Sequence, residues 1–239
     1  MWDKNALVGL DLETTSVEPE SARIVGACVV TVNGSRSWLV NPGVPIEAGA
    51  TAVHGMTDEH VSVHGADPAE AVPAIVARVR SAWEQGRIVV VFNAPFDLTV
   101  LDRESRRVSG TGLGRIGPVI DSMVLDKLLD PFRRGSRRLA DVAAHYLGTE
   151  LAPDRVHDAA QDATLALRVA WRIGRRNPAI GFMELDKLQR VQTEAKARQA
   201  RSLDDYFRRT GHPEAGKVDG SWPIRPLPAD CALTVPDWG

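Results

Sequence analysis

The stretch RIVVVF, residues 87–92, constrains the fold more than any other part of this sequence. A short run of β-branched and apolar residues, without polar alternation, is typical of a strand that is buried on both faces of its sheet. The segment after it, PFDLTVLDRESRRV, predicts a helix with Pro95 in its first turn. A buried strand that leads straight into a helix indicates an α/β protein.

The remaining elements extend this pattern. Apolar, β-branched composition predicts further strands at 6–11, 23–32, 36–40 and the start of 118–129, where the strand runs into a helix. Helical patterns cover 68–84, with Asp67 as cap, then 137–147, 159–176 and about 182–209. The segment 41–61 is rich in Pro and Gly, and we expect a long loop there. Three adjacent strands followed by alternating strands and helices predict a mixed central sheet flanked by helices.

This order of elements predicts three parts of the chain. Residues 1–178 would form the α/β domain, and residues 179–211 a helical C-terminal extension. Residues 212–239 would be a Pro- and Gly-rich tail without periodicity.

Composition excludes several classes of protein. The formal net charge is −2, which argues against binding to nucleic acid by overall charge and leaves a local basic rim open. The only cysteines are Cys28 and Cys231, so a disulfide scaffold or a cysteine zinc site is not expected. No secretion signal is recognised, and no apolar run approaches the ~20 residues that cross a bilayer. We therefore expect a soluble, cytoplasmic protein without membrane contact.

Two carboxylates follow the first predicted strand, in LVGLDLETTS. Asp11 and Glu13 are two residues apart, so on an extended strand both side chains point to the same face. Two like charges held this close repel each other unless a cation lies between them. The pair alone is compatible with a charged turn or with a metal site.

Two further acids stand near the ends of other predicted elements. Asp97 falls in the first turn of its helix, where the helix dipole alone would favour an acid. Asp162 lies within an otherwise apolar helix, where burial of a carboxylate is costly unless it has a partner. Asp158 suits the cap of that helix, and His157 directly precedes it.

Three motifs in this order, D-x-E-T-T, N-A-x-F-D and H-D-A-x-x-D, resemble those of the DEDDh 3′–5′ exonucleases. This family includes the proofreading epsilon subunit of bacterial DNA polymerase III, ribonuclease T and oligoribonuclease. The resemblance covers roughly residues 5–176, and the segment VHGMTDE resembles the family's H-G-[IM]-T segment. It implies a ribonuclease-H-like fold.

The resemblance also implies the chemistry. Asp11, Glu13, Asp97 and Asp162 would bind two Mg²⁺ or Mn²⁺ ions, and His157 would be the general base. Two such ions ~3.5–4 Å apart activate a water and stabilise the leaving 3′ oxygen, so that nucleoside 5′-monophosphates are released from the 3′ end. Further candidate contacts to the substrate are Thr14, Thr15, His54, Gly55, Asn93 and Phe96. Of these, Phe96 could pack beneath a base or fill the core, and the core is the favoured interpretation.

The implied partner is a single-stranded or frayed 3′ end of DNA, as in DNA repair or proofreading. An exoribonuclease that trims short RNA is the nearest alternative, because no motif reveals whether a 2′-OH is required. A catalytically silent module that binds nucleic acid or a polymerase is a second alternative, although none of the acids is lost. Association with a DNA polymerase stays open, but no clamp-binding segment is recognised; the oligomeric state is also open.

The C-terminal half of the chain carries two further signals. Four arginines in DPFRRGSRRLAD form either a solvated charge cluster or a rim that contacts phosphates; they are Arg133, Arg134, Arg137 and Arg138. In the last helix, one face of apolar residues would pack on the domain, and Tyr206 and Phe207 would anchor its end.

Overall fold

The computed structural model describes residues 1–148 and 158–228 of the chain. Its centre is a five-stranded sheet in the order β3-β2-β1-β4-β5. The strands are β1 (Leu7–Thr14), β2 (Ile24–Thr31), β3 (Gly34–Leu39), β4 (Ile88–Val91) and β5 (Val119–Asp121). Strand β2 is antiparallel to both β1 and β3, whereas β4 runs parallel to β1 and β5 parallel to β4. The predicted α/β fold with a mixed sheet is confirmed.

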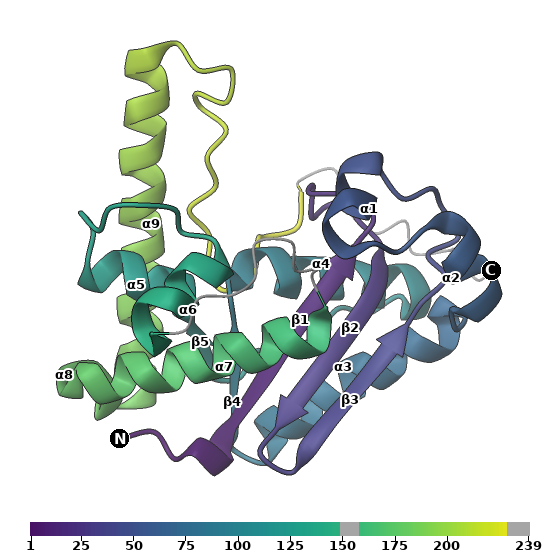
Figure 1. Cartoon of the computed structure of the whole chain (residues 1–239), viewed down its shortest axis with the longest axis horizontal. Coiled ribbons are helices and arrows are strands. Elements are labelled where there is room, and N and C mark those ends of the chain that lie inside the picture. The colour runs from purple at the N-terminus through teal and green to yellow at the C-terminus, as the bar shows by residue number, and fades with distance from the viewer. Residues whose placement is uncertain (149–157, 229–239) are drawn as a thin grey trace, which may run out of the picture.

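Helices cover both faces of the sheet (Figure 1). The helices are α1 (Ala48–His54), α2 (Asp58–His64), α3 (Pro68–Glu84), α4 (Ala94–Ser109), α5 (Ser122–Leu129), α6 (Leu139–Leu147), α7 (Ala159–Arg176), α8 (Pro178–Gly181) and α9 (Leu185–Thr210). The even-numbered residues of β1, such as Leu10, pack with α3 and α4, while α6 and α7 pack together on the other face. None of the described helices is long and apolar enough to cross a membrane.

The predicted helix caps are confirmed. The Asp67 carboxylate accepts a hydrogen bond from the amide of Ala69 at the start of α3, and Asp158 accepts from Ala160 and Gln161 at the start of α7. These bonds satisfy amides that have no partner within the helix. The cap of α7 also fixes the first turns of the helix that carries Asp162.

The prediction of a long loop over 41–61 is wrong. This segment contains α1 and the start of α2, both only seven residues long. Gly55 ends α1 in the left-handed conformation, with φ +74°, and Thr57 caps α2 by accepting from the amide of His60. Gly55 and Thr57 therefore mark the junction between two short helices.

After α9, the described residues up to 228 return to the domain. Trp222 is only 8% exposed and joins the core beside α3 and α4. The amide of Arg225 donates to Thr99 Oγ1 over 2.9 Å, and Arg103 donates to the carbonyls of Arg225 and Pro226. Such irregular backbone has no periodicity, so its packing depends on one inserted tryptophan that the sequence pattern does not reveal.

The predicted anchor at the end of α9 is only partly present. Phe207 stacks on His212, with ring centroids 4.1 Å apart. Tyr206, in contrast, is 53% exposed. It does not anchor the helix to the domain.

Gly9 allows α7 to approach β1 closely. A methyl group at this position would lie 2.6 Å from the carbonyl oxygen of Ala163, so the helix backbone would have to move. We expect Gly9→Ala to lower the free energy of unfolding by about 1–3 kcal/mol, as overpacking does elsewhere. Gly49→Ala is the matched control: it adds a methyl group to open space in α1, and we expect about 0.5–1 kcal/mol of stabilisation. Urea denaturation of both variants checks this, and equal stabilities would contradict the close approach.

Candidate metal and nuclease site

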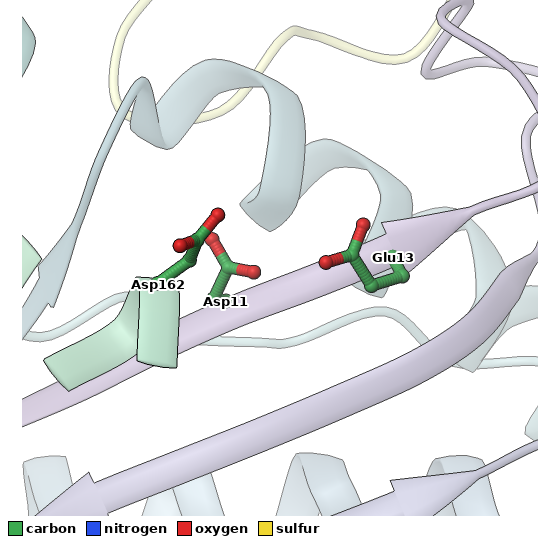
Figure 2. Close-up of side chains that lie close together, drawn as sticks. All are labelled: Asp11, Glu13 and Asp162. Atoms are coloured by element: carbon green, nitrogen blue, oxygen red, sulfur yellow. The ribbon is translucent and has the colours of Figure 1, made fainter. Parts of the chain in front are cut away.

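Strand β1 and helix α7 bring three carboxylates together. Asp11 and Glu13 share the face of β1 that α7 crosses, and Asp162 faces them from the first turns of α7 (Figure 2). One oxygen from each of the three side chains can be chosen so that all lie within 4.8 Å of one another. The period of two along the strand and the close approach at Gly9 together create this geometry.

Asp97 approaches the same cluster from α4. Because β1 and β4 are parallel, their carboxyl ends lie at one edge of the sheet, and α4 starts there. Asp97 is 4% exposed, and its Oδ1 accepts a hydrogen bond from the amide of Leu12 over 3.1 Å. It lies outside the three-carboxylate group, but its charge acts directly on Asp11.

The cluster raises the pKa values of its own members. Burial raises the pKa of Asp11 well above its ordinary value, and the charges of Asp97, Glu13 and Asp162 add to this effect. Burial and the charge of Asp162 raise the pKa of Glu13 from 4.5 to about 7. Burial also raises the pKa of Asp97, although the amide of Leu12 opposes the shift. Without a cation, ionisation of the cluster is therefore unfavourable.

The donor set fits divalent cations of the hard type. Carboxylate oxygens are the preferred ligands of Mg²⁺ and Mn²⁺, and no cysteine competes in the cluster. Within residues 1–148 and 158–228, no lysine or arginine forms an ion pair with Asp11, Glu13 or Asp97. No described lysine or arginine therefore neutralises the charge of these three acids.

A cleft of about 350 Å³ opens beside the cluster. It lies between β2, β3, the end of α1 and the start of α7, and Glu13, His54 and Asp158 border it. Trp38 and Met56 supply apolar surface in the same cleft. Polar and apolar lining next to a carboxylate cluster suits a substrate that has both charge and a ring system.

The predicted substrate contacts from the end of β1 to α1 fall into two groups. Thr14 and Thr15 are buried, and their hydroxyls are used locally: Thr14 Oγ1 donates to the carbonyl of Ser16, and Thr15 Oγ1 accepts from the amide of Arg23. His54 is also buried, but it borders the cleft, and Gly55 follows it at the end of α1. The threonines therefore shape the turn after Glu13, while α1 places His54 at the cleft.

The hydrogen bonds of His54 fix its tautomer. His54 Nδ1 accepts a hydrogen bond from the amide of Met56 over 3.1 Å, which leaves the ring proton on Nε2 in the neutral imidazole. Nε2 lies 3.2 Å from the carbonyl oxygen of Thr14 and donates to it. His54 thus ties α1 to the end of the strand that carries Glu13.

The second motif has structural tasks of its own. Asn93 has φ +71° and is the only non-glycine residue with positive φ in the part of the chain that the structure describes. This left-handed residue turns the chain from β4 into α4 and thereby aims Asp97. Phe96 packs against the core cluster, in agreement with the core interpretation. His157, the predicted general base, lies outside the described residues.

Asp121 is a site residue whose hydrogen bonds to several parts of the chain the sequence does not reveal. Its carboxylate caps α5 by accepting from the amides of Met123 and Val124. The same carboxylate also accepts from the amides of Asn93 and Ala94, over 3.2 and 2.9 Å. Trp222 Nε1 donates to it over 3.3 Å. One buried acid therefore fixes the starts of two helices, including the one that carries Asp97.

We expect Asp121→Ala to lower the free energy of unfolding by about 3 kcal/mol, because buried amides lose their acceptor. It should also weaken metal binding, since α4 no longer starts at a fixed point. The control is Asp67→Ala, which removes the exposed cap of α3 and should cost about 1 kcal/mol without affecting metal binding. Urea denaturation and calorimetric Mn²⁺ titration measure the two effects. Equal metal affinity in both variants would show that Asp121 does not position Asp97.

Comparisons with known proteins find an exonuclease family and DNA polymerase III subunits. The family model described as exonuclease, RNase T, matches residues 8–170, which include all four acids. The DNA polymerase III subunit epsilon-like protein of Rhodobacter capsulatus is 32% identical over 204 residues, which cover 81% of this chain and 27% of that protein. The DNA polymerase III subunit epsilon of Haemophilus influenzae is 27% identical over 224 residues, covering 86% and 83% of the two chains.

A solved structure has the same fold. Escherichia coli exonuclease I in complex with a dA16 oligonucleotide superposes with a TM-score of 0.58 at 18% identity. The match covers 72% of this chain and 41% of that one. The chain thus spans less than half of exonuclease I and about a quarter of the Rhodobacter protein. The shared architecture is the ribonuclease-H-like sheet with its flanking helices.

Proposed function

The chain belongs to the RNase T family of exonucleases, and we propose that it is a metal-dependent 3′–5′ exonuclease that acts on DNA. The observation that carries the proposal is the cluster of Asp11, Glu13 and Asp162, with oxygens within 4.8 Å and Asp97 acting on it from α4. The charges of these acids raise the pKa of Asp11 and Glu13, and bound divalent cations would offset this repulsion.

In this proposal Asp11, Glu13, Asp97 and Asp162 hold two Mg²⁺ or Mn²⁺ ions. Bound there, the ions would lower the pKa of an attacking water and stabilise charge on the leaving oxygen. Asp162 reaches the cluster because Asp158 caps α7 and Gly9 allows this helix to approach β1. His157 directly precedes the cap and would accept the proton of the water.

The cleft beside Glu13 would receive the 3′-terminal nucleotide. His54 and Trp38 border this cleft from α1 and β3. A sugar–base unit could occupy it while its phosphate faces the carboxylates. Each cycle would release one nucleoside 5′-monophosphate and leave a new 3′-OH, which is the chemistry that proofreading and DNA repair require.

The proposal does not require association with a DNA polymerase. The Haemophilus and Rhodobacter relatives are a DNA polymerase III epsilon subunit and an epsilon-like protein. The sequence shows no clamp-binding segment, so a stand-alone exonuclease is the form that we propose.

A time course on 5′-labelled single-stranded DNA and RNA of one sequence tests the proposal. Each strand is incubated with Mg²⁺, Mn²⁺ or EDTA, alongside the His157→Ala variant. We expect a metal-dependent ladder that shortens from the 3′ end of DNA and is lost in the variant. Preferential cleavage of RNA would instead support the exoribonuclease alternative, and no cleavage of either strand would support a silent binding module.

A further inference from the structure

The distal half of α9 stands clear of the α/β domain (Figure 1). The proximal half is fixed to the sheet: Leu188 is fully buried, and Gln192 bonds to the backbone of Val119 and Asp121 in β5. Beyond Ala200 most side chains are exposed, including Leu203 at 43% and Tyr206 at 53%. This half lies outside residues 8–170, the part that the exonuclease family model matches.

A cleft of about 580 Å³ separates α9 from α5 and the loop after it. Lys127 and Arg137 line it from the α5 side, and Arg198, Ser202 and Tyr206 line it from α9. No carboxylate lines the cleft among the residues that the structure describes. The cleft therefore combines three cations with hydroxyl groups, apolar side chains and one exposed aromatic ring.

The charge of this region differs from that of the whole chain. Residues 126–138 and 194–209 together hold ten lysines and arginines against five acids, while the chain has 29 against 31. Buried Asp126 is already engaged, since Arg133 and Arg137 both donate to it. Within the described ranges Lys127 has no ion pair, and Arg198 has only a 3.7 Å contact with exposed Glu194. Of the three described cations that line the cleft, Arg137 is thus compensated by Asp126, whereas Lys127 and Arg198 have no close ion pair.

Aromatic rings lie at the margins of this basic surface. Tyr206 lines the cleft itself, and Phe132, in the loop after α5, is 91% exposed. Large exposed rings next to cations are the combination that single-stranded nucleic acid binds, because phosphates contact the cations and bases stack on the rings.

Asp121 links the cleft to the carboxylate cluster, because its charge acts on Asp97. Asp121, which fixes the start of α4 and hence Asp97, is also the residue from which α5 starts. Lys127 is six residues further along this helix, which corresponds to about 9 Å. A strand whose 3′ end lies at the cluster can therefore continue into the cleft.

We propose that the cleft between α5 and α9 binds single-stranded DNA upstream of the 3′ end that the acid cluster holds, with Lys127 and Arg198 at phosphates and Tyr206 stacked on a base. This inference rests on the proposed function. It assigns the α9 extension to substrate binding and gives the arginine-rich loop after α5 a place in the same surface.

The test is a binding measurement on the full chain in EDTA, so that the DNA is not cleaved. The probe is a 5′-fluorescent single strand of about 16 nucleotides, the upper site size of such grooves, and anisotropy gives the Kd. The double variant Arg198→Ala/Tyr206→Ala should raise the Kd about 10- to 100-fold and reduce its salt dependence. The control Arg78→Ala/Phe182→Ala removes one exposed arginine and one exposed aromatic ring elsewhere, and its Kd should equal that of the wild type.

A second readout separates this inference from the proposed function. With Mg²⁺, the ratio of kcat/KM on the long strand to that on a dinucleotide should fall in the cleft variant and not in the control. An unchanged Kd and an unchanged ratio, in an enzyme that degrades DNA, would overturn the cleft and leave the proposed function intact. Cleft-dependent DNA binding without degradation of any strand would support the cleft and overturn the proposed function.

Discussion

Asp11→Asn should reduce exonuclease activity by on the order of 10³-fold or more, the scale of losing a key electrostatic group in an active site. Asp11 lies at the centre of the cluster, since Asp97, Glu13 and Asp162 all act on its charge. An amide in its place keeps the shape of the side chain but removes the negative charge that a metal ion requires. The measurement is kcat/KM on labelled single-stranded DNA with Mg²⁺.

The same substitution should leave the fold intact. The pKa of Asp11 is raised by burial and by its acidic neighbours, so the charge of Asp11 destabilises the metal-free protein. We expect Asp11→Asn to have a higher Tm than the wild type in EDTA. Asp141→Asn is the control, because Asp141 is exposed on α6 and should affect neither quantity. Full Mg²⁺-dependent activity in Asp11→Asn would exclude the carboxylate cluster as the reaction centre.

The second large effect is on stability, which should fall in the metal-free protein as the pH rises. The pKa of Glu13 is about 7 in the folded protein against an ordinary 4.5. Between these two values the folded state binds more protons than the unfolded state, so the free energy of unfolding decreases with pH and levels off above pH 7. The shift corresponds to about 3 kcal/mol. The raised pKa values of Asp11 and Asp97 act in the same direction.

Thermal unfolding in EDTA measures this effect. For a chain of this size, a loss of about 3 kcal/mol corresponds to a Tm lower by roughly 6–12 °C at slightly alkaline pH than at mildly acidic pH. Glu13→Gln should remove its share of the difference, and saturating Mg²⁺ or Mn²⁺ should reduce it, because the ions bind the ionised cluster. A wild-type Tm in EDTA that stays constant or rises over this pH range would contradict the electrostatic repulsion within the cluster.

The fold could be predicted from the sequence where a local pattern is compatible with only one kind of element. The apolar run 87–92 and the caps Asp67 and Asp158 are of this kind, because a buried strand and a capped helix each need particular residue types. The pair α1 and α2 escaped prediction because each helix is only seven residues long and the junction between them resembles a loop. The insertion of Trp222 also escaped, since one buried ring in irregular backbone leaves no period.

The candidate site could be predicted in part. The spacing of Asp11 and Glu13 already placed both carboxylates on one face of a strand, and burial of Asp162 in an apolar helix indicated a partner. Which tertiary contacts hold these groups could not be predicted. The use of Asp121 by two helices and the approach of α7 over Gly9 depend on residues far apart in the chain. The role of His157 stays a prediction.

Anomalous diffraction from crystals soaked in Mn²⁺ is the most direct test of whether the acid cluster binds divalent metal. We expect anomalous density about 2 Å from carboxylate oxygens of Asp11 and Asp162, with Glu13 and Asp97 contributing to the same pair of ions. The density should disappear from crystals of Asp11→Asn. Anomalous density that lies elsewhere, or none at the cluster at saturating Mn²⁺, would show that these acids do not form a metal site.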